Sequence, residues 1–228
     1  MTQFPAEEAS PFVAYPPQAE FGRVVPKNKI YEHGQVNTRL KELFVGQVEQ
    51  IVWQYKLAPE TINLPAKPGV PEIQVFRIAL KTADLSVDVL KAIDAAVQFP
   101  MIFELDHGGK TQVIAAYKRP SEAAANHWVI SDYFASSWLP ADTGRSLLPT
   151  VLDLGGLYEA LLQRLLPLAP RGHESLGGLV ERVASVRAKQ REIEQVRAKL
   201  AREKQFKRKV EINAVLRTLN LQLEELSH

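Results

Sequence analysis

Three residues in the middle of the chain have the types that a metal-dependent nuclease uses. Glu104 and Asp106 lie on one expected strand, and Lys118 lies on the next. Carboxylates and a lysine can bind Mg²⁺ and activate water, as in a nuclease of the restriction-endonuclease type. Such a site needs an acid two residues before the lysine, and Ala116 occupies that position. The nuclease motif is therefore incomplete.

The expected strand pairing also separates these residues. A Gly-Gly pair at 108–109 between two apolar runs predicts a two-residue hairpin. This hairpin places Glu104 opposite Val113. Because side chains alternate along a strand, Lys118 then points to the other face of the sheet. A nuclease stays an alternative hypothesis, and the sequence favours a protein without enzymatic activity.

Other residue types with metal or cofactor chemistry form no motif. The chain has no Cys, and its five His lie in different segments without a pair at helical spacing. The Gly-Gly pairs at 108–109 and 155–156 lack the context of a phosphate-binding loop. We therefore predict no metal and no cofactor.

Composition and segment lengths predict an ordinary globular protein. The chain has 228 residues, of which 46% are hydrophobic and 24% charged. No apolar run is long enough to span a membrane, and the first residues lack the features of a signal peptide. Together with the absence of Cys, this predicts a cytoplasmic protein that does not bind membranes.

The positive charge is concentrated near the C-terminal end. Residues 187–211 hold ten Lys or Arg against four Glu, a local balance of +6, while the net charge of the whole chain is +2. Cationic side chains bind phosphates without reading base sequence. The candidates for contact with DNA phosphates are Arg187, Lys189, Arg191, Arg197, Lys199, Arg202, Lys204, Lys207, Arg208 and Lys209.

The same region predicts one long helix. Residues 179–226 contain neither Pro nor Gly, so residues 176–226 can form an unbroken helix of about 75 Å, which needs a partner to bury its apolar stripe. Apolar residues first recur at steps of three and four, as in the contact stripe of a coiled coil. Beyond residue 193 this spacing becomes irregular, and the polar Glu203 occupies a position where the stripe would need an apolar residue. The candidates for docking to a partner are Leu176, Leu179, Val183, Val186 and Ile193.

The remaining residues predict an α+β fold, with a small mixed β-sheet, covering helices and a long C-terminal coiled-coil helix. We expect an extended Pro-rich arm (1–26), an α+β domain (27–170) and a basic coiled-coil arm (171–228). We expect one helix from Asn37 to before Pro59, a second from Ser86 to before Pro100 and a third over 152–166. The expected strands are 73–80, 101–106, 111–118 and 127–131.

Five segments together resemble a prokaryotic family, domain-of-unknown-function family 4391. They are Val25–Tyr31, Leu43–Asn63, Glu72–Phe76, Ile114–Arg119 and Glu203–Leu216. The family offers no catalytic residues to transfer. The resemblance implies a genomic context beside large helicases and DNA methyltransferases in anti-phage defence clusters.

The leading hypothesis is a non-enzymatic accessory subunit of a DNA-targeting defence complex. In this hypothesis the C-terminal arm docks to a helicase or methyltransferase and also contacts DNA phosphates. Two alternatives stay open: the metal-dependent nuclease, and a structural homodimer joined by its coiled-coil arms.

Overall fold

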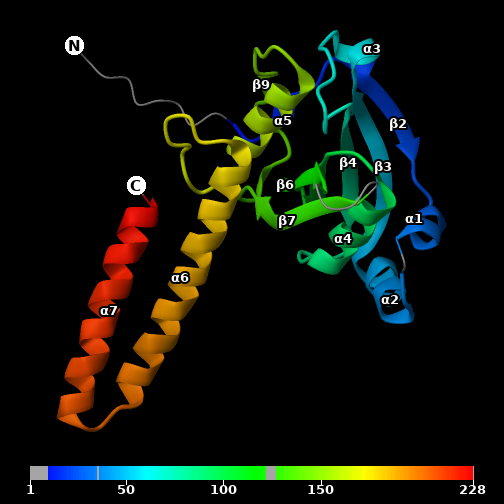
Figure 1. Ribbon diagram of the computed structural model, residues 1–228. Coiled ribbons are helices and arrows are strands. Elements are labelled where there is room, and N and C mark those ends of the chain that lie inside the picture. Colours follow the sequence, from blue (N-terminus) through cyan, green and yellow to red (C-terminus); the bar gives the residue numbers. More distant parts are fainter. Residues whose placement is uncertain (1–9, 35, 122–126, 228) are drawn as a thin grey trace. The chain divides into compact units, whose positions relative to one another are not determined.

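The computed structural model describes residues 10–34, 36–121 and 127–227. The chain divides after Leu165 into two compact units. The first unit contains a sheet with its helices, and the second contains the C-terminal helices (Figure 1). Residues 1–9 of the predicted N-terminal arm lie outside the described residues.

A seven-stranded mixed sheet forms the centre of the first unit (Figure 1). Its order is β2-β3-β4-β5-β6-β7, with β8 paired to β6; β4 and β5 are parallel, and the other neighbours are antiparallel. The strands are β2 (Glu20–Val24), β3 (Val48–Leu57), β4 (Ile73–Leu80), β5 (Met101–His107), β6 (Lys110–Pro120), β7 (Trp128–Ala135) and β8 (Leu139–Pro140). The predicted α+β class is confirmed.

Apolar side chains from three helices and the central strands form the main core on one face of this sheet. The core joins α1, α2 and α4 to β3, β4 and β5, and its centre includes Phe44, Ile93 and Phe103, each with no exposed surface. The helices of the unit are α1 (Lys27–His33), α2 (Thr38–Gln47), α3 (Pro59–Ile62), α4 (Val87–Ala96) and α5 (Leu154–Gln163), with a 3-10 turn η1 (Pro17–Ala19). A separate parallel pair joins β1 (Val13–Ala14) to β9 (Ser146–Leu147).

Local sequence signals predicted several elements correctly. Strands β4 and β5 lie where expected, and Asn37 and Ser86 cap α2 and α4 by accepting backbone N–H bonds. The two-residue hairpin turns at Gly108 and Gly109, both with positive φ, and the register pairs Glu104 with Val113 as predicted. Strand β7 is longer than expected, and α5 is shorter.

The helix predicted from Asn37 to before Pro59 is wrong in its second half. Helix α2 ends at Gln47, and Val48–Leu57 is a strand between β2 and β4. The last carbonyl groups of the helix accept bonds from two lysines: Lys27 Nζ lies 3.1 Å from Phe44 O, and Lys81 Nζ lies 2.8 Å from Val45 O. Strand β2, from the predicted extended arm, pairs with β3, so this part of the arm belongs to the sheet.

The prediction of one unbroken C-terminal helix is also wrong. The second unit holds two helices, α6 (Leu176–Arg202) and α7 (Phe206–Ser227), which pack side by side as a hairpin (Figure 1). The break is at Glu203, whose carboxylate accepts the backbone N–H groups of Lys204 and Gln205, each at 2.8 Å. The chain therefore supplies the partner helix itself.

The hairpin has an apolar seam. Ile193 of α6 packs with Leu216 and Leu219 of α7, and all three are at most 9% exposed. Partly buried side chains extend the seam on both sides: Val196, Leu200 and Leu223. The two helices thus bury between them Ile193, one of the five residues that the sequence assigned to an external partner.

An arginine clamps the open end of the hairpin. Arg182 of α6 donates to Glu174 at 2.8 and 2.9 Å, to Ala169 O at 2.7 Å and to Leu226 O near the end of α7 at 3.1 Å. The hydrogen bonds from Arg182 to the carboxylate, followed by the one from the backbone N–H of Arg171, lower the pKa of Glu174 from 4.5 to about 2. Arg171 adds a bond to Glu225 O at 2.5 Å.

We expect the clamp to stabilise the helices in a pH-dependent way. A carboxyl group with a lowered folded pKa contributes stability above its unfolded pKa, and this contribution is lost as the pH falls from about 4.5 to 2. In thermal melts followed by circular dichroism, Arg182→Met should lower the Tm at pH 6, and the difference from the wild type should shrink toward pH 2.

The matched control is Lys189→Met, which breaks the i, i+3 ion pair with Glu192 at 2.9 Å. That substitution should change stability by less than about 0.5 kcal/mol at any pH. Equal effects of the two substitutions at pH 6 would contradict the clamp.

Candidate functional site

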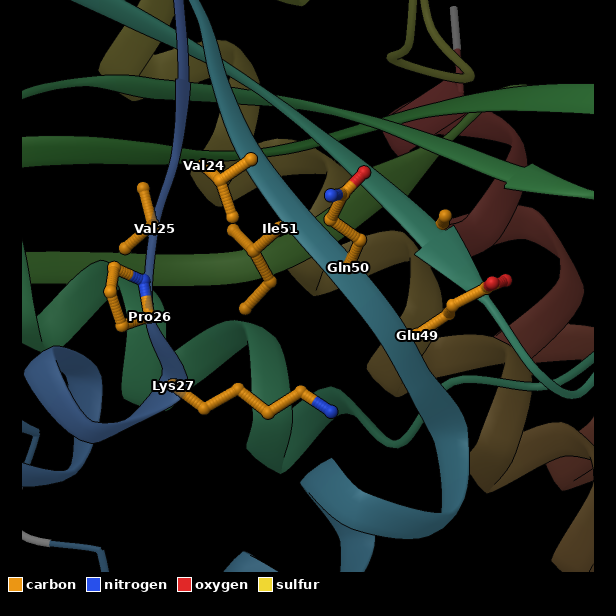
Figure 2. A pocket seen from close by; sticks show the side chains of 8 residues that line it. Val24, Val25, Pro26, Lys27, Glu49, Gln50 and Ile51 are labelled. Atoms are coloured by element: carbon orange, nitrogen blue, oxygen red, sulfur yellow. The ribbon is translucent and has the colours of Figure 1, made fainter.

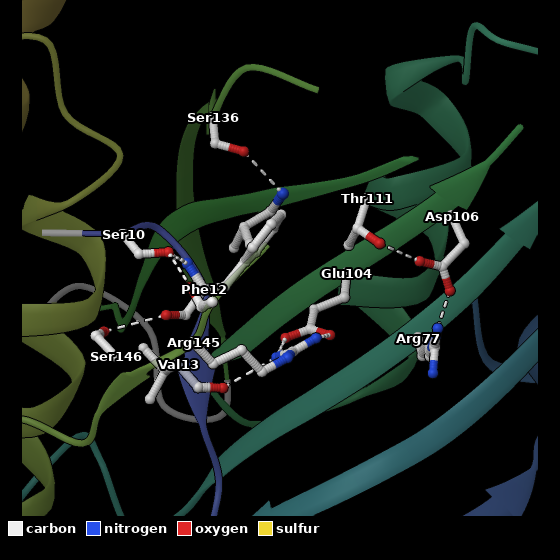
Figure 3. A network of polar contacts seen from close by, with 12 residues as sticks. Ser10, Phe12, Val13, Arg77, Glu104, Asp106, Thr111, Ser136, Arg145 and Ser146 are labelled. Carbon is white, nitrogen blue, oxygen red and sulfur yellow. Dashed lines mark hydrogen bonds and ion pairs between the residues drawn. The ribbon is translucent and has the colours of Figure 1, made fainter. Parts of the chain in front are cut away.

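Glu104 faces an arginine on the side of the sheet opposite the main core. Its side chain is 3% exposed and forms a bidentate pair with Arg145, with Oε1 to Nη1 at 2.7 Å and Oε2 to Nη2 at 2.8 Å (Figure 3). Arg145 also donates to Val13 O in the N-terminal segment at 2.9 Å. Both carboxylate oxygens of Glu104 are therefore engaged in pairing that holds β5, the N-terminal segment and Arg145 together.

Asp106 is engaged in the same way. Its carboxylate accepts a bond from Thr111 Oγ1 at 2.6 Å and another from Arg77 Nε (Figure 3). The two acids thus each have their own cationic partner. In this arrangement they do not present free oxygens to a metal ion.

Lys118 lies on the other face, as the strand register predicts. Its side chain is 1% exposed, and Nζ donates to Asp94 O at 2.5 Å, to Asp94 Oδ1 at 3.3 Å and to Val97 O. Tyr133 donates its hydroxyl to the same carboxylate. The structure therefore does not bring Lys118 together with Glu104 and Asp106.

Burial controls the ionisation of this second group. It raises the pKa of Asp94 and lowers the pKa of Lys118, and in each case the opposite charge of the partner acts against the shift. Burial and the neighbouring Asp94 also raise the pKa of Tyr133. The ammonium group closes the C-terminal end of α4 by binding two of its last carbonyl oxygens.

These pairings leave the described residues without a metal-binding cluster. Over residues 10–34, 36–121 and 127–227, no group of three or more His, Asp or Glu could hold an ion. The polar residues that suggested a nuclease all have partners within the fold. The nuclease stays a hypothesis that this geometry does not favour.

A hollow of about 460 Å³ opens where β2 runs into α1 (Figure 2). Lys27 is the cation of its lining, and its ammonium group already donates to Phe44 O and to Val48 O. Burial, followed by the nearby Lys81, lowers the pKa of Lys27. The lysine serves the junction of α2 and β3, so this hollow is a weak candidate for a site.

The basic residues of the hairpin are mostly exposed and gather around its turn. Arg187 and Lys189 are half-buried, and Lys189 pairs with Glu192. The other candidates for phosphate contact are exposed: Arg191, Arg197, Lys199, Arg202, Lys204, Lys207, Arg208 and Lys209. The turn at 203–205 is therefore a basic tip, which we define as Arg197–Lys209.

The candidates for partner docking are already buried. Leu176, Leu179, Val183, Val186 and Ile193 are each at most 8% exposed. The exposed large apolar residues of the hairpin lie instead on α7, where Phe206 is 82%, Val210 53%, Val215 49% and Leu221 56% exposed. At 100° per residue, Phe206, Val210 and Leu221 point within about 60° of one another on the side of α7 away from the seam, with the exposed Arg217 between them, and we call these three side chains the outer stripe of α7. Sequence reasoning did not separate these residues from the seam because it predicted one continuous helix with a single apolar stripe.

The chain matches a family called domain of unknown function (DUF4391) over residues 13–223. The protein belongs to the DUF4391 family. The matched range includes both the sheet and the hairpin, so both are parts of the DUF4391 domain. No curated protein and no solved structure matches the chain. Among the described residues, no helix is long and apolar enough to cross a membrane.

We expect Lys118→Met to destabilise the first unit strongly. The substitution leaves the buried carboxylate of Asp94 and two carbonyl groups without their donor, which costs about 3–5 kcal/mol. Urea denaturation measures this difference. Lys110→Met, at an exposed strand end, is the control and should leave stability nearly unchanged. A loss below about 1 kcal/mol in Lys118→Met would contradict the structural role of the pair.

Proposed function

We propose that this DUF4391 protein is a non-enzymatic accessory subunit of a DNA-targeting anti-phage defence complex. The hairpin docks to a larger helicase or methyltransferase partner, and the basic tip contacts DNA phosphates. The observation that carries the proposal is the outer stripe of α7, three exposed apolar side chains on one side of the helix beside a concentration of cations. The defence context rests on what the family resemblance implies.

The outer stripe fits a protein partner. A helix side that faces water is normally polar, and this side of α7 is mixed: Phe206, Val210 and Leu221 are exposed there at spacings that align them, with Asn213 and Arg217 between them. Burying the exposed part of each side chain would contribute about 1–2 kcal/mol. An amphipathic helix in an apolar groove is a common mode of protein recognition. The stripe is therefore our proposed docking surface, in place of residues 176–193.

We expect Phe206→Gln combined with Leu221→Gln to weaken binding to the helicase or methyltransferase encoded beside this protein. Gln keeps the helix propensity and removes the apolar side chain, so the affinity should fall at least about tenfold. Pull-down of the purified pair, followed by calorimetry, measures the change.

The matched control is Leu147→Gln with Leu152→Gln, two side chains of the first unit that are 83% and 90% exposed. It should bind normally. Equal binding by both double variants would overturn the docking surface. A homodimer that only the α7 variant dissociates would instead show that the stripe joins two copies, which is the homodimer alternative.

The basic tip fits nucleic acid because its cations are exposed and close together in sequence. Seven Lys or Arg occupy Arg197–Lys209, with Glu203 as the one acid in that range. The Glu203 carboxylate is already occupied by the backbone N–H groups that begin α7. Such a tip can bind phosphates of any sequence, which suits an accessory role beside a partner that selects the site.

We expect DNA binding to depend steeply on salt through this tip. Replacing Lys207, Arg208 and Lys209 with Gln should weaken binding and reduce the slope of log K against log salt by about 0.9 for each phosphate that the variant no longer neutralises. Fluorescence anisotropy with duplex DNA at several salt concentrations measures the slope. The control replaces Arg39, Lys91 and Lys110 of the first unit with Gln, the same change in charge. Identical slopes in the two triple variants, or binding that salt does not affect, would contradict the proposal.

A further inference from the structure

A small apolar pocket lies among α1, the strands β3 and β4, and the end of α4. Its volume is about 310 Å³, and its walls include Ile30, Trp53, Phe76 and Phe99. The indole N–H of Trp53 donates to Tyr55 O at 3.2 Å. Aromatic and aliphatic side chains thus make most of the surface, as in pockets that hold small organic ligands.

One buried polar atom in this pocket lacks a partner. Gln74 lines the pocket and is 2% exposed, and its Oε1 accepts no hydrogen bond from any residue that the structure describes. Its Nε2 donates to Oε1 of Glu72. A carboxylate only accepts, so the amide nitrogen must face Glu72 and the amide oxygen must face away.

Neighbouring contacts fix Gln74 in this orientation. Glu72 Oε2 lies 3.2 Å from Nζ of Lys56, and the same ammonium group lies 2.7 Å from Glu60. The backbone N–H of Gln74 donates to Pro100 O at 2.9 Å. The ion pairs of Lys56 with Glu60 and Glu72 therefore hold the Gln74 amide in place, while its oxygen accepts no hydrogen bond.

Lys118 holds the part of the pocket wall that the end of α4 forms. Val97 lines the pocket at the end of α4, and its carbonyl oxygen accepts from the buried Lys118 ammonium group. The rim carries Lys29 and His33, both exposed. The pocket thus has an apolar interior and a polar rim, and the unpartnered amide oxygen of Gln74 is buried in its wall.

We propose that this pocket binds a flat apolar ring that carries an N–H donor, of the indole class, with the N–H donating to Gln74 Oε1. A buried acceptor without a partner is unfavourable, and a ligand donor removes that penalty while the ring covers the aromatic walls. The volume is at the small end of the range for ligand pockets, which suits one bicyclic ring. The inference uses the first unit alone and is independent of the docking proposal.

The test compares indole with benzofuran, a ring of the same shape in which oxygen replaces the N–H. Ligand-observed NMR titration with the full-length protein measures both dissociation constants. Indole should bind at least about tenfold more tightly, because benzofuran offers no hydrogen to the amide oxygen. Because both ligands are compared on the wild-type protein, a folding defect cannot cause the difference.

Gln74→Met should remove the preference for indole over benzofuran, since it keeps the side-chain length and deletes the acceptor. The matched control is Gln98→Met, the same change at an exposed residue of the same pocket, which should keep the preference. Equal affinities of the two rings for the wild type, or no saturable binding of indole up to its solubility limit, would overturn the proposal.

Discussion

The second unit depends on one constraint: a helix with a continuous apolar stripe must bury that stripe against another helix. The chain meets this requirement by turning at Glu203 and packing Leu216 and Leu219 of α7 on Ile193 of α6. Once the seam is closed, two features are left on the surface, the outer stripe of α7 and the basic tip. The functional proposal follows from what the hairpin leaves exposed, since the seam itself is occupied.

The first unit uses its reactive residue types to hold its own elements together. Glu104 and Asp106 are paired on one face of the sheet, and Lys118 is paired on the other. The buried charges of Glu104, Asp94 and Lys118 must be paired because an isolated one is costly, and each pair joins elements that are distant in sequence. The residues whose types suggested catalysis therefore form ion pairs that hold the fold together. The exception among buried side-chain atoms of the described chain is Gln74 Oε1, which is why the ligand proposal centres on it.

Turn and helix-capping residues in the sequence predicted the features that depend on neighbouring residues alone. The Gly-Gly turn fixed the register of β5 and β6, and the caps at Asn37 and Ser86 fixed where two helices begin. The change from α2 to β3 depends on neighbouring strands and on lysine side chains from other segments, so apolar periodicity could not show it. Glu203 was visible as a polar residue at a seam position, but its capping role requires a bend that the sequence alone does not display. Likewise, Arg145 lies 41 residues from Glu104, beyond any local pattern.

The hairpin is tested most directly by a distance within one molecule. Because the chain has no Cys, the substitutions Ala188→Cys and Gln222→Cys give two unique spin-label positions, both exposed, one on each helix. Pulsed electron resonance, with labelled protein diluted in unlabelled protein, reports the distance between them. Adjacent helices with axes about 10 Å apart predict a short separation, roughly 20 Å with the label linkers. A separation of about 50 Å, as one continuous helix requires, would contradict the hairpin and the docking surface defined by it.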